Sequence, residues 1–239
     1  MAVTFRQMMN RVLTNLTEDE LSVSTTEITD TYEKLVRNFV NIIKEEMEDA
    51  AQWRVLQTTA TATVAASGES IAISGTNERS RLVRVFDSSR HVVTPLVYNT
   101  TDADSPGQME ELDLQELKRR RRRDSSEPNV EDSHYFALEQ TTAGLTLVVY
   151  PASTKEQTFS VELVVPQDRF AADVNDIDSA ISVPALPLEL GATWFALEER
   201  GEELGVSGVF SEQRYRTALD SAIARDEAEQ GNINELVAV

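Results

Sequence analysis

The spacing of apolar residues predicts helices at the start of the chain. From Tyr32 to Ala51 the apolar side chains recur at steps of three and four, which places them on one face of a helix. Asp30 precedes this segment, and Glu33 stands three residues after Asp30. This spacing is typical of a helix N-cap with a capping box. The segment 5–16 has the same period. We therefore predict a short helix followed by a long one over 32–55, roughly 38 Å in length.

The period changes to two after Gln57. In some segments apolar and polar residues alternate, and other segments are short apolar runs. Turns rich in Ser, Gly and Asn separate these segments, and this pattern is typical of β-strands. Thr142-Ala143-Gly144 predicts a hairpin turn between two of them. Short strands in this number favour an antiparallel sandwich or a strongly twisted sheet. The predicted strands are 58–66, 69–74, 81–86, 91–98, 135–138, 145–150 and 159–165.

A helix is expected to leave the β part at 106–123. Ser105 would be its N-cap, Pro106 its first residue and Gln108 the partner of the cap. Acidic residues fill the front of this segment and the basic run 118–123 its end, an order that suits the helix dipole.

Helical spacing returns near the C-terminal end. Pro187 would open one helix, which ends before Gly201, and Ser211 would cap a second, which Gly231 would stop. We therefore predict an α+β fold, in which the N- and C-terminal helices form a discontinuous helical bundle with an antiparallel β insertion of about seven strands. The predicted domains are a helical domain of 1–57 and 178–230, a β insertion of 58–177 with the helix at 106–123, and a tail of 231–239.

Composition and charge limit the possible functions. Of the 239 residues 41% are hydrophobic and 26% charged, which indicates a globular protein, and the absence of cysteine excludes disulfides and thiol chemistry. No apolar run approaches the roughly 20 residues of a membrane span, and a polar N-terminal segment predicts no cleaved signal peptide. The 41 acidic and 22 basic residues give a net charge of −19, which disfavours general binding to DNA or membranes and would suit a channel that DNA passes without adhering.

No catalytic or metal-binding motif stands out. His91 and His134 lack the spacing of metal ligands, and Asp132-Ser133-His134 are consecutive, whereas the members of a triad come from separate elements. The stretch 102–113 matches a calcium loop only in part, because Pro106 stands where an oxygen ligand is needed. We predict no catalytic residue, no metal site and no cofactor. The abundant carboxylates leave a hydrolase open as an alternative.

The basic run is the most unusual local feature of the sequence, and it comprises Arg119, Arg120, Arg121, Arg122 and Arg123. It could be a solvated helix end, a contact with an acidic protein surface, or a contact with DNA. Arginines along a DNA channel would retard moving DNA. We therefore expect the run to bind protein, where Arg–carboxylate pairs can be bidentate.

Two further surfaces are expected to contact neighbouring molecules. Leu236, Val237 and Val239 are apolar residues beyond the predicted helix stop, so this tail is expected to become ordered on a partner. The polar side of the long helix is expected to face a second copy of the chain. Its charged residues are Lys34, Arg37, Lys44, Glu45, Glu48 and Asp49.

The order of these elements resembles a known family. The long helix with YEKLVRNFVN at 32–41 and AQWRVL at 51–56, and the C-terminal stretches LELGATWFALEERGE at 188–202 and YRTAL at 215–219, resemble the head-to-tail adaptor proteins of tailed bacteriophages, of the portal-adaptor or tail-tubular type. The resemblance covers nearly the whole chain and rests on packing patterns. The charged stretch 110–127 departs from the family pattern.

The resemblance implies a structural virion protein that is not an enzyme. It implies a ring of about twelve copies at the head–tail junction, assembled in the host cytoplasm. The ring would bind the portal protein, partly through the C-terminal tail, receive the next tail component, and let double-stranded DNA pass through its lumen without specific binding. The alternatives are a virion-associated hydrolase that uses carboxylates and a nucleic-acid-binding protein that acts through the arginine run.

Overall fold

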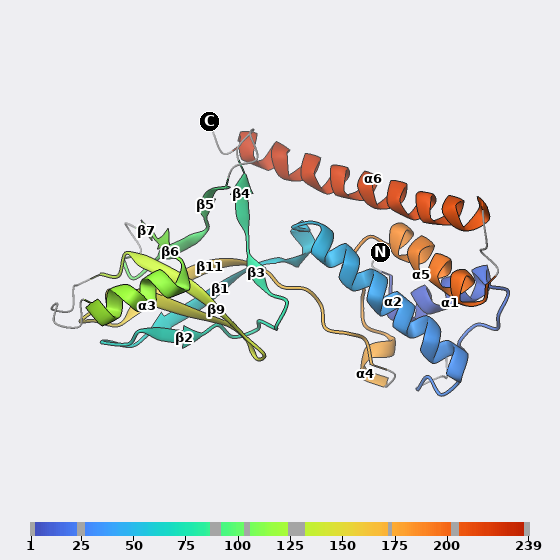
Figure 1. Cartoon of the computed structure of the whole chain (residues 1–239), viewed down its shortest axis with the longest axis horizontal. Coiled ribbons are helices and arrows are strands. Elements are labelled where there is room, and N and C mark those ends of the chain that lie inside the picture. Colours follow the sequence, from blue (N-terminus) through green and yellow to red (C-terminus); the bar gives the residue numbers. More distant parts are fainter. Residues whose placement is uncertain are drawn as a thin grey trace. The chain divides into compact units, whose positions relative to one another are not determined.

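The protein has an α+β fold, as predicted, and its chain divides into two compact units (Figure 1). The computed structural model describes residues 3–22, 27–86, 92–102, 106–123, 132–171, 174–201 and 206–236. The helical unit comprises Met1–Val55 and Gln167–Val239, and the β unit comprises Leu56–Pro166. Both ends of the chain therefore belong to one unit, and the β unit is inserted between them.

The helical unit is built around α5. This helix packs against α1, α2 and α6, and α2 and α5 run antiparallel, because Phe39 stacks on Phe195 while Ile43 lies beside Gly191. The buried apolar residues of α1 and α2 recur at helical spacing, as the sequence predicts. The helices are α1 (Phe5–Asn15), α2 (Thr31–Ala50), α4 (Val174–Ile177), α5 (Ala185–Glu199) and α6 (Val206–Leu236).

The start of the long helix agrees with the prediction, whereas its end does not. The Asp30 side chain accepts hydrogen bonds from the backbone N–H groups of Tyr32 and Glu33, which confirms the predicted N-cap. α2 stops at Ala50, because the backbone of Ala51 is extended. The indole of Trp53 is buried and donates to the Met47 carbonyl, which satisfies a backbone acceptor at the end of the helix.

Helix α6 is longer than predicted at both ends. It begins at Val206 rather than after Ser211, and it continues through Gly231 to Leu236. The prediction of a tail over 231–239 is therefore wrong for 231–236. A glycine inside a helix costs only about 1 kcal/mol relative to alanine, which a helix of 31 residues tolerates.

Strand β11 (Gln157–Val164) is central to the first sheet of the β unit. It pairs antiparallel with β1 (Gln57–Val64), β6 (Val97–Asn99) and β3 (Arg81–Leu82), and β7 (Gly107–Gln108) extends the sheet beyond β6. Strands β4 (Arg84–Phe86) and β5 (Val92–Pro95) form a separate antiparallel pair.

The second sheet has the order β2 (Ser70–Ala72), β10 (Gly144–Tyr150), β9 (Tyr135–Thr141) and β8 (Glu110–Glu111). The predicted hairpin turn joins β9 to β10, with Gly144 at a φ of +124°. β8 pairs parallel to β9, which the prediction of an antiparallel insertion did not include. One apolar core joins the two sheets, and its fully buried members include Val97, Phe136, Leu147, Phe159 and Val161.

The predicted helix at 106–123 is wrong in its first half. Residues 107–111 form β7 and β8, and α3 spans Leu114–Arg123. Met109 lies between these strands in the core, so its burial draws this segment into the sheets. The cap of α3 is Asp113, whose side chain accepts from the N–H groups of Gln115 and Glu116. Ser105, the predicted cap, lies outside the described residues.

The segment after β11 belongs to the helical unit, although the sequence analysis placed it in the β insertion. Asn41 of α2 donates to the Phe170 carbonyl and accepts from the Phe170 N–H. Lys44 donates to the carbonyls of Gln167 and Asp168. Lys44 and Glu48 are therefore fully buried, and the expectation that they face a second copy is wrong.

Candidate functional site

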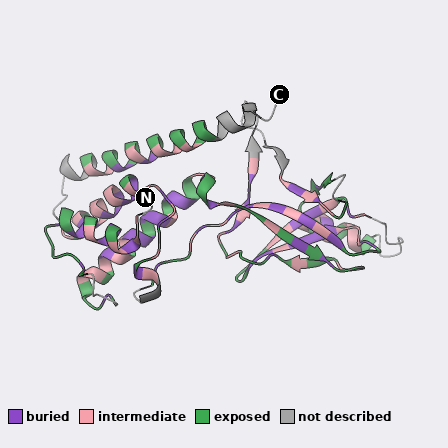
Figure 2. Ribbon diagram, turned by 180° about the vertical axis from the view of Figure 1, so that it is seen from behind, coloured by how far each residue is buried: buried purple, intermediate pink, exposed green. Residues whose placement is uncertain are grey.

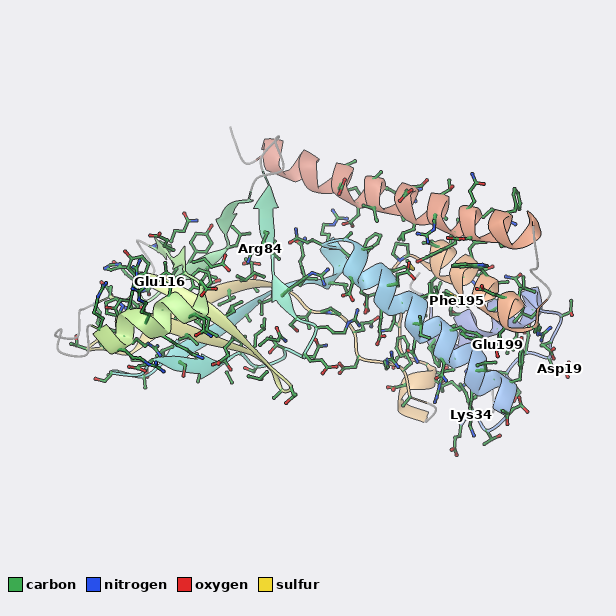
Figure 3. The ribbon with its side chains drawn as sticks, viewed as in Figure 1. Asp19, Lys34, Arg84, Glu116, Phe195 and Glu199 are labelled. Atoms are coloured by element: carbon green, nitrogen blue, oxygen red, sulfur yellow. The ribbon has the colours of Figure 1, made fainter. Side chains whose placement is uncertain are left out.

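The arginine run lies on α3, which packs on β9 through the fully buried Leu117 (Figure 3 labels Glu116 on this helix). The carboxylate of Glu116 forms ion pairs with two of the arginines. The Nε of Arg120 lies 3.1 Å from its carboxylate, and Arg119 lies 3.8 Å from it. The hydrogen bond from Arg120 to Glu116 raises the pKa of that guanidinium. Arg120 also lies over the ring of Tyr135, 5.1 Å from its centroid.

Arg121 contacts a different part of the β unit. It forms an ion pair with Glu69 at 3.0 Å, and its Nη2 donates to the backbone carbonyls of Glu69 and Val149 at 2.7 and 2.8 Å. Burial lowers the pKa of Arg121, which the charge of Glu69 partly opposes. Arg121 is thus a structural residue, which joins α3 to β10 and to the residue that precedes β2.

The remaining arginines, Arg119, Arg122 and Arg123, are exposed. The side chain of Arg119 is 82% accessible. Residues 119, 122 and 123 share one face of the helix because they stand at i, i+3 and i+4. We call these three residues the cationic face. The structure therefore divides the predicted binding run into two arginines that hold α3 in place and three that face solvent.

The apolar residues predicted at the C-terminal end lie at the limit of the described chain. Leu236 is the last residue of α6, and nothing is described of its side chain. Val237 and Val239 lie outside the described residues. The structure anchors α6 to its own unit as far as Glu229, which pairs with Arg54, while Asp226 accepts from the Arg54 N–H.

A groove between α5 and α6 is a candidate site that the sequence analysis missed. It has a volume of about 500 Å³. Leu186 of α5 and Phe210 of α6 line it with side chains that are 61% and 60% exposed. Leu190 and Ala218 contribute further apolar surface, and Arg214 and Arg225 stand along α6. Phe210 was overlooked because it precedes the predicted start of its helix.

Between residues 210 and 229, most of helix α6 is exposed or partly exposed (Figure 2). Tyr215 and Leu219 are its buried residues among the side chains that the structure describes. Tyr215 packs against Trp194 of α5, and burial strongly raises the pKa of its phenol. One narrow stripe of α6 therefore holds the helix on its unit, and the adjacent stripe forms a wall of the groove.

A second cavity of about 520 Å³ in the β unit is polar. Asp132, His134 and Lys155 line it together with Asp102 and Asn99. Ser133 is buried and donates to the Pro151 carbonyl, and Asp132 accepts from Gln157. The hydroxyl of Ser133 is therefore engaged with the backbone, and the residues 132–134 do not form a catalytic triad.

Metal binding has no structural support in the described part of the chain. No group of three or more possible metal ligands occurs there. Within the partial calcium-loop match, Asp113 caps α3, while Asp104 and Ser105 lie outside the described residues. His91 also lies outside them. Among the helices described, none is both long and apolar enough to cross a membrane.

No protein-family model matches the sequence, and no curated protein matches it.

Proposed function

We propose that this protein is a head-to-tail adaptor of a tailed bacteriophage, a structural protein that forms a ring under the portal and attaches the tail. The observation that carries the proposal is the insertion of a β unit between two terminal segments that close one helical unit. The sequence resemblance rests on this order of elements. α2 and α5, the helices that carry the resemblance, pack on each other through Phe39 and Phe195.

The distribution of charge supports a structural role beside DNA. The helical unit holds 25 acidic and 11 basic residues, a net of −14, and the β unit holds 16 and 11, a net of −5. Both units therefore repel phosphate, so a ring of such chains would let DNA pass through its channel without retaining it.

The division of the arginine run favours protein as its partner. Arg120 and Arg121 are paired with carboxylates of their own unit. Arg119, Arg122 and Arg123 are exposed, and α3 contains no aromatic residue beside them for base stacking. The cationic face would dock on an acidic surface of a second copy or of the next tail component.

Electron microscopy of the purified full chain tests the proposal. We expect closed rings with a central channel, in which the helical unit supplies most contacts between adjacent copies through α2 and α5. A chain that remains monomeric at all concentrations, both alone and with portal particles, would contradict it. A gel-shift titration with duplex DNA tests the nucleic-acid alternative, which requires salt-dependent binding that is lost when Arg119 and Arg122 are changed to Gln.

A further inference from the structure

We propose that the groove between α5 and α6 binds the C-terminal segment 230–239 of a second copy of this chain. This inference deepens the proposed function, on which it rests for the assembly of copies, and it names the contact that would join one copy to the next.

The groove has the form of a helix-binding surface. Phe210, Arg214, Thr217, Ser221 and Arg225 lie along one face of α6, at helical spacing, and all five line the groove. From Phe210 to Arg225 this wall is about 22 Å long at 1.5 Å per residue. Phe210 and Leu186 are two large apolar side chains that remain mostly in water. An apolar ligand would remove them from water, which is favourable.

The segment 230–239 has the complementary chemistry. Ile233, Leu236 and Val237 stand at i, i+3 and i+4, a spacing that would place them on one face if the segment binds as a helix. Glu235 is the one charged residue in the segment. An amphipathic segment of ten residues spans about 15 Å as a helix, which fits within the groove wall.

Charge complementarity favours this occupant. Arg214 and Arg225 flank the groove and are exposed, and no ion pair of either is found in the described part of the structure. The chain as a whole has a net charge of −19, so two exposed cations beside one groove are a distinct feature of this surface. Glu235 would supply a carboxylate to them beside the apolar contact, and charge pairs of this kind fix the register of a docked segment.

The segment cannot occupy the groove of its own chain. α6 is one continuous helix from Val206 to Leu236, and Arg225 is the last residue of α6 in the groove wall. Leu236 therefore lies about 16 Å beyond Arg225 along the same helix axis. A helix cannot fold back on its own wall without breaking, so the segment reaches a groove only on another copy. Contacts of this head-to-tail kind close a ring or extend a filament.

Introduced cysteines provide a direct test, because the chain has no cysteine of its own. Full-length chains with Ala222→Cys in the groove are mixed with full-length chains that carry Val237→Cys, under mild oxidation. We expect a disulfide-linked pair of the two different chains. The matched control replaces Val237→Cys with Glu227→Cys, which is exposed on α6 outside the groove and outside the segment, and it should give no such pair.

Charge exchange in the full chain provides an independent test by sedimentation velocity. Arg214→Glu with Arg225→Glu, and separately Glu235→Arg, should each weaken self-association by about tenfold or more. The chain that carries all three changes should recover association, whereas Glu227→Arg should leave it unchanged. Far-ultraviolet circular dichroism checks that each variant is folded.

Three results would overturn the inference. They are a disulfide within one chain when both cysteines are placed in it, the absence of a linked pair above the control, and unchanged association in the charge variants. The last two would also result if the groove takes another protein or a small apolar ligand. Rings seen without the 222–237 link would refute this contact and leave the proposed function in place. A linked pair without rings would support this contact and refute the proposed function.

Discussion

The ammonium group of Lys44 and the carboxylate of Glu48 lie 3.3 Å apart on successive turns of α2, and both side chains are completely buried. Lys44 also donates to the Gln167 and Asp168 carbonyls at 2.7 and 3.0 Å, and Glu48 accepts from the Gln167 N–H at 3.1 Å. The pair therefore bonds to the chain where it returns from the β unit to the helical unit. A buried ion pair with these additional hydrogen bonds has its polar atoms satisfied.

Loss of one partner of this pair is expected to be costly. Lys44→Met leaves the Glu48 charge buried and two carbonyls without a donor, and it should lower the free energy of unfolding by about 3–5 kcal/mol. Lys44→Met combined with Glu48→Gln should lower it less, because no buried charge remains. Urea unfolding followed by tryptophan fluorescence measures this, since Trp53 and Trp194 both belong to the helical unit.

Lys34→Met is the matched control on the same helix, because Lys34 is exposed and its loss should change stability by no more than about 0.5 kcal/mol. A double variant that is less stable than Lys44→Met alone would show that the buried charge is not the reason for the loss.

The ion pair between Arg6 and Asp178 predicts an acid-dependent part of stability. The two side chains lie 2.9 Å apart and join α1 to the segment after α4. The hydrogen bond from Arg6 lowers the pKa of Asp178 below its ordinary 3.8. A lowered folded-state pKa stabilises the fold above the unfolded-state value, and this contribution is lost as the pH falls through the folded value.

Asp178→Asn should therefore have a lower urea midpoint than the unchanged chain at pH 5–7, and the difference should vanish as the pH falls below 3.8. Unfolding curves at several pH values measure it. A difference that grows toward low pH would reverse the expected sign.

Two neighbouring arginines of α3 should respond differently to the same substitution. Arg121→Gln removes the donors to the Glu69 and Val149 carbonyls, and it should destabilise the β unit by about 1–3 kcal/mol. Amide exchange at Val149, whose N–H bonds the Glu69 carbonyl, should become faster. Arg119→Gln removes an exposed side chain and should change stability by about 0.5 kcal/mol or less.

Ring assembly is expected to depend more on the exposed Arg119 than on the structural Arg121. Arg119→Gln combined with Arg122→Gln should reduce ring formation in micrographs, because these residues belong to the cationic face. Equal effects of the 119 and 121 substitutions on stability would contradict the division of the run into structural and exposed arginines.

Gly191 of α5 packs closely against both α2 and α6. A Cβ atom at this position would lie 2.7 Å from a methyl carbon of Ile43 and 3.0 Å from the ring of Tyr215, both fully buried. Alanine gains about 1 kcal/mol in helix propensity over glycine, but forced repacking of a core costs about 1–3 kcal/mol. We expect Gly191→Ala to destabilise the helical unit in urea unfolding. Gly231→Ala in α6 is the control, expected to be neutral or stabilising.

The local pattern of the sequence determined the α+β class, the helices at both ends, the Asp30 cap and the β9–β10 hairpin. These features depend on neighbours within a few residues, whose periods of 3.6 and 2 can be read directly. The same pattern placed Lys44 and Glu48 on the polar side of α2, because a charged residue at those positions is normally solvated.

Only the tertiary structure decided the features that depend on distant partners. Lys44 and Glu48 are buried because the segment 167–170 returns to cover them, more than 100 positions along the chain. Residues 107–111 are strands because Met109 is drawn into a core formed by other strands. Arg121 is structural because Glu69 and Val149 meet it, and the groove exists because α5 and α6 pack along one narrow stripe. In each case the deciding free energy comes from contacts between segments far apart in sequence, and such contacts leave no periodic pattern in either segment alone.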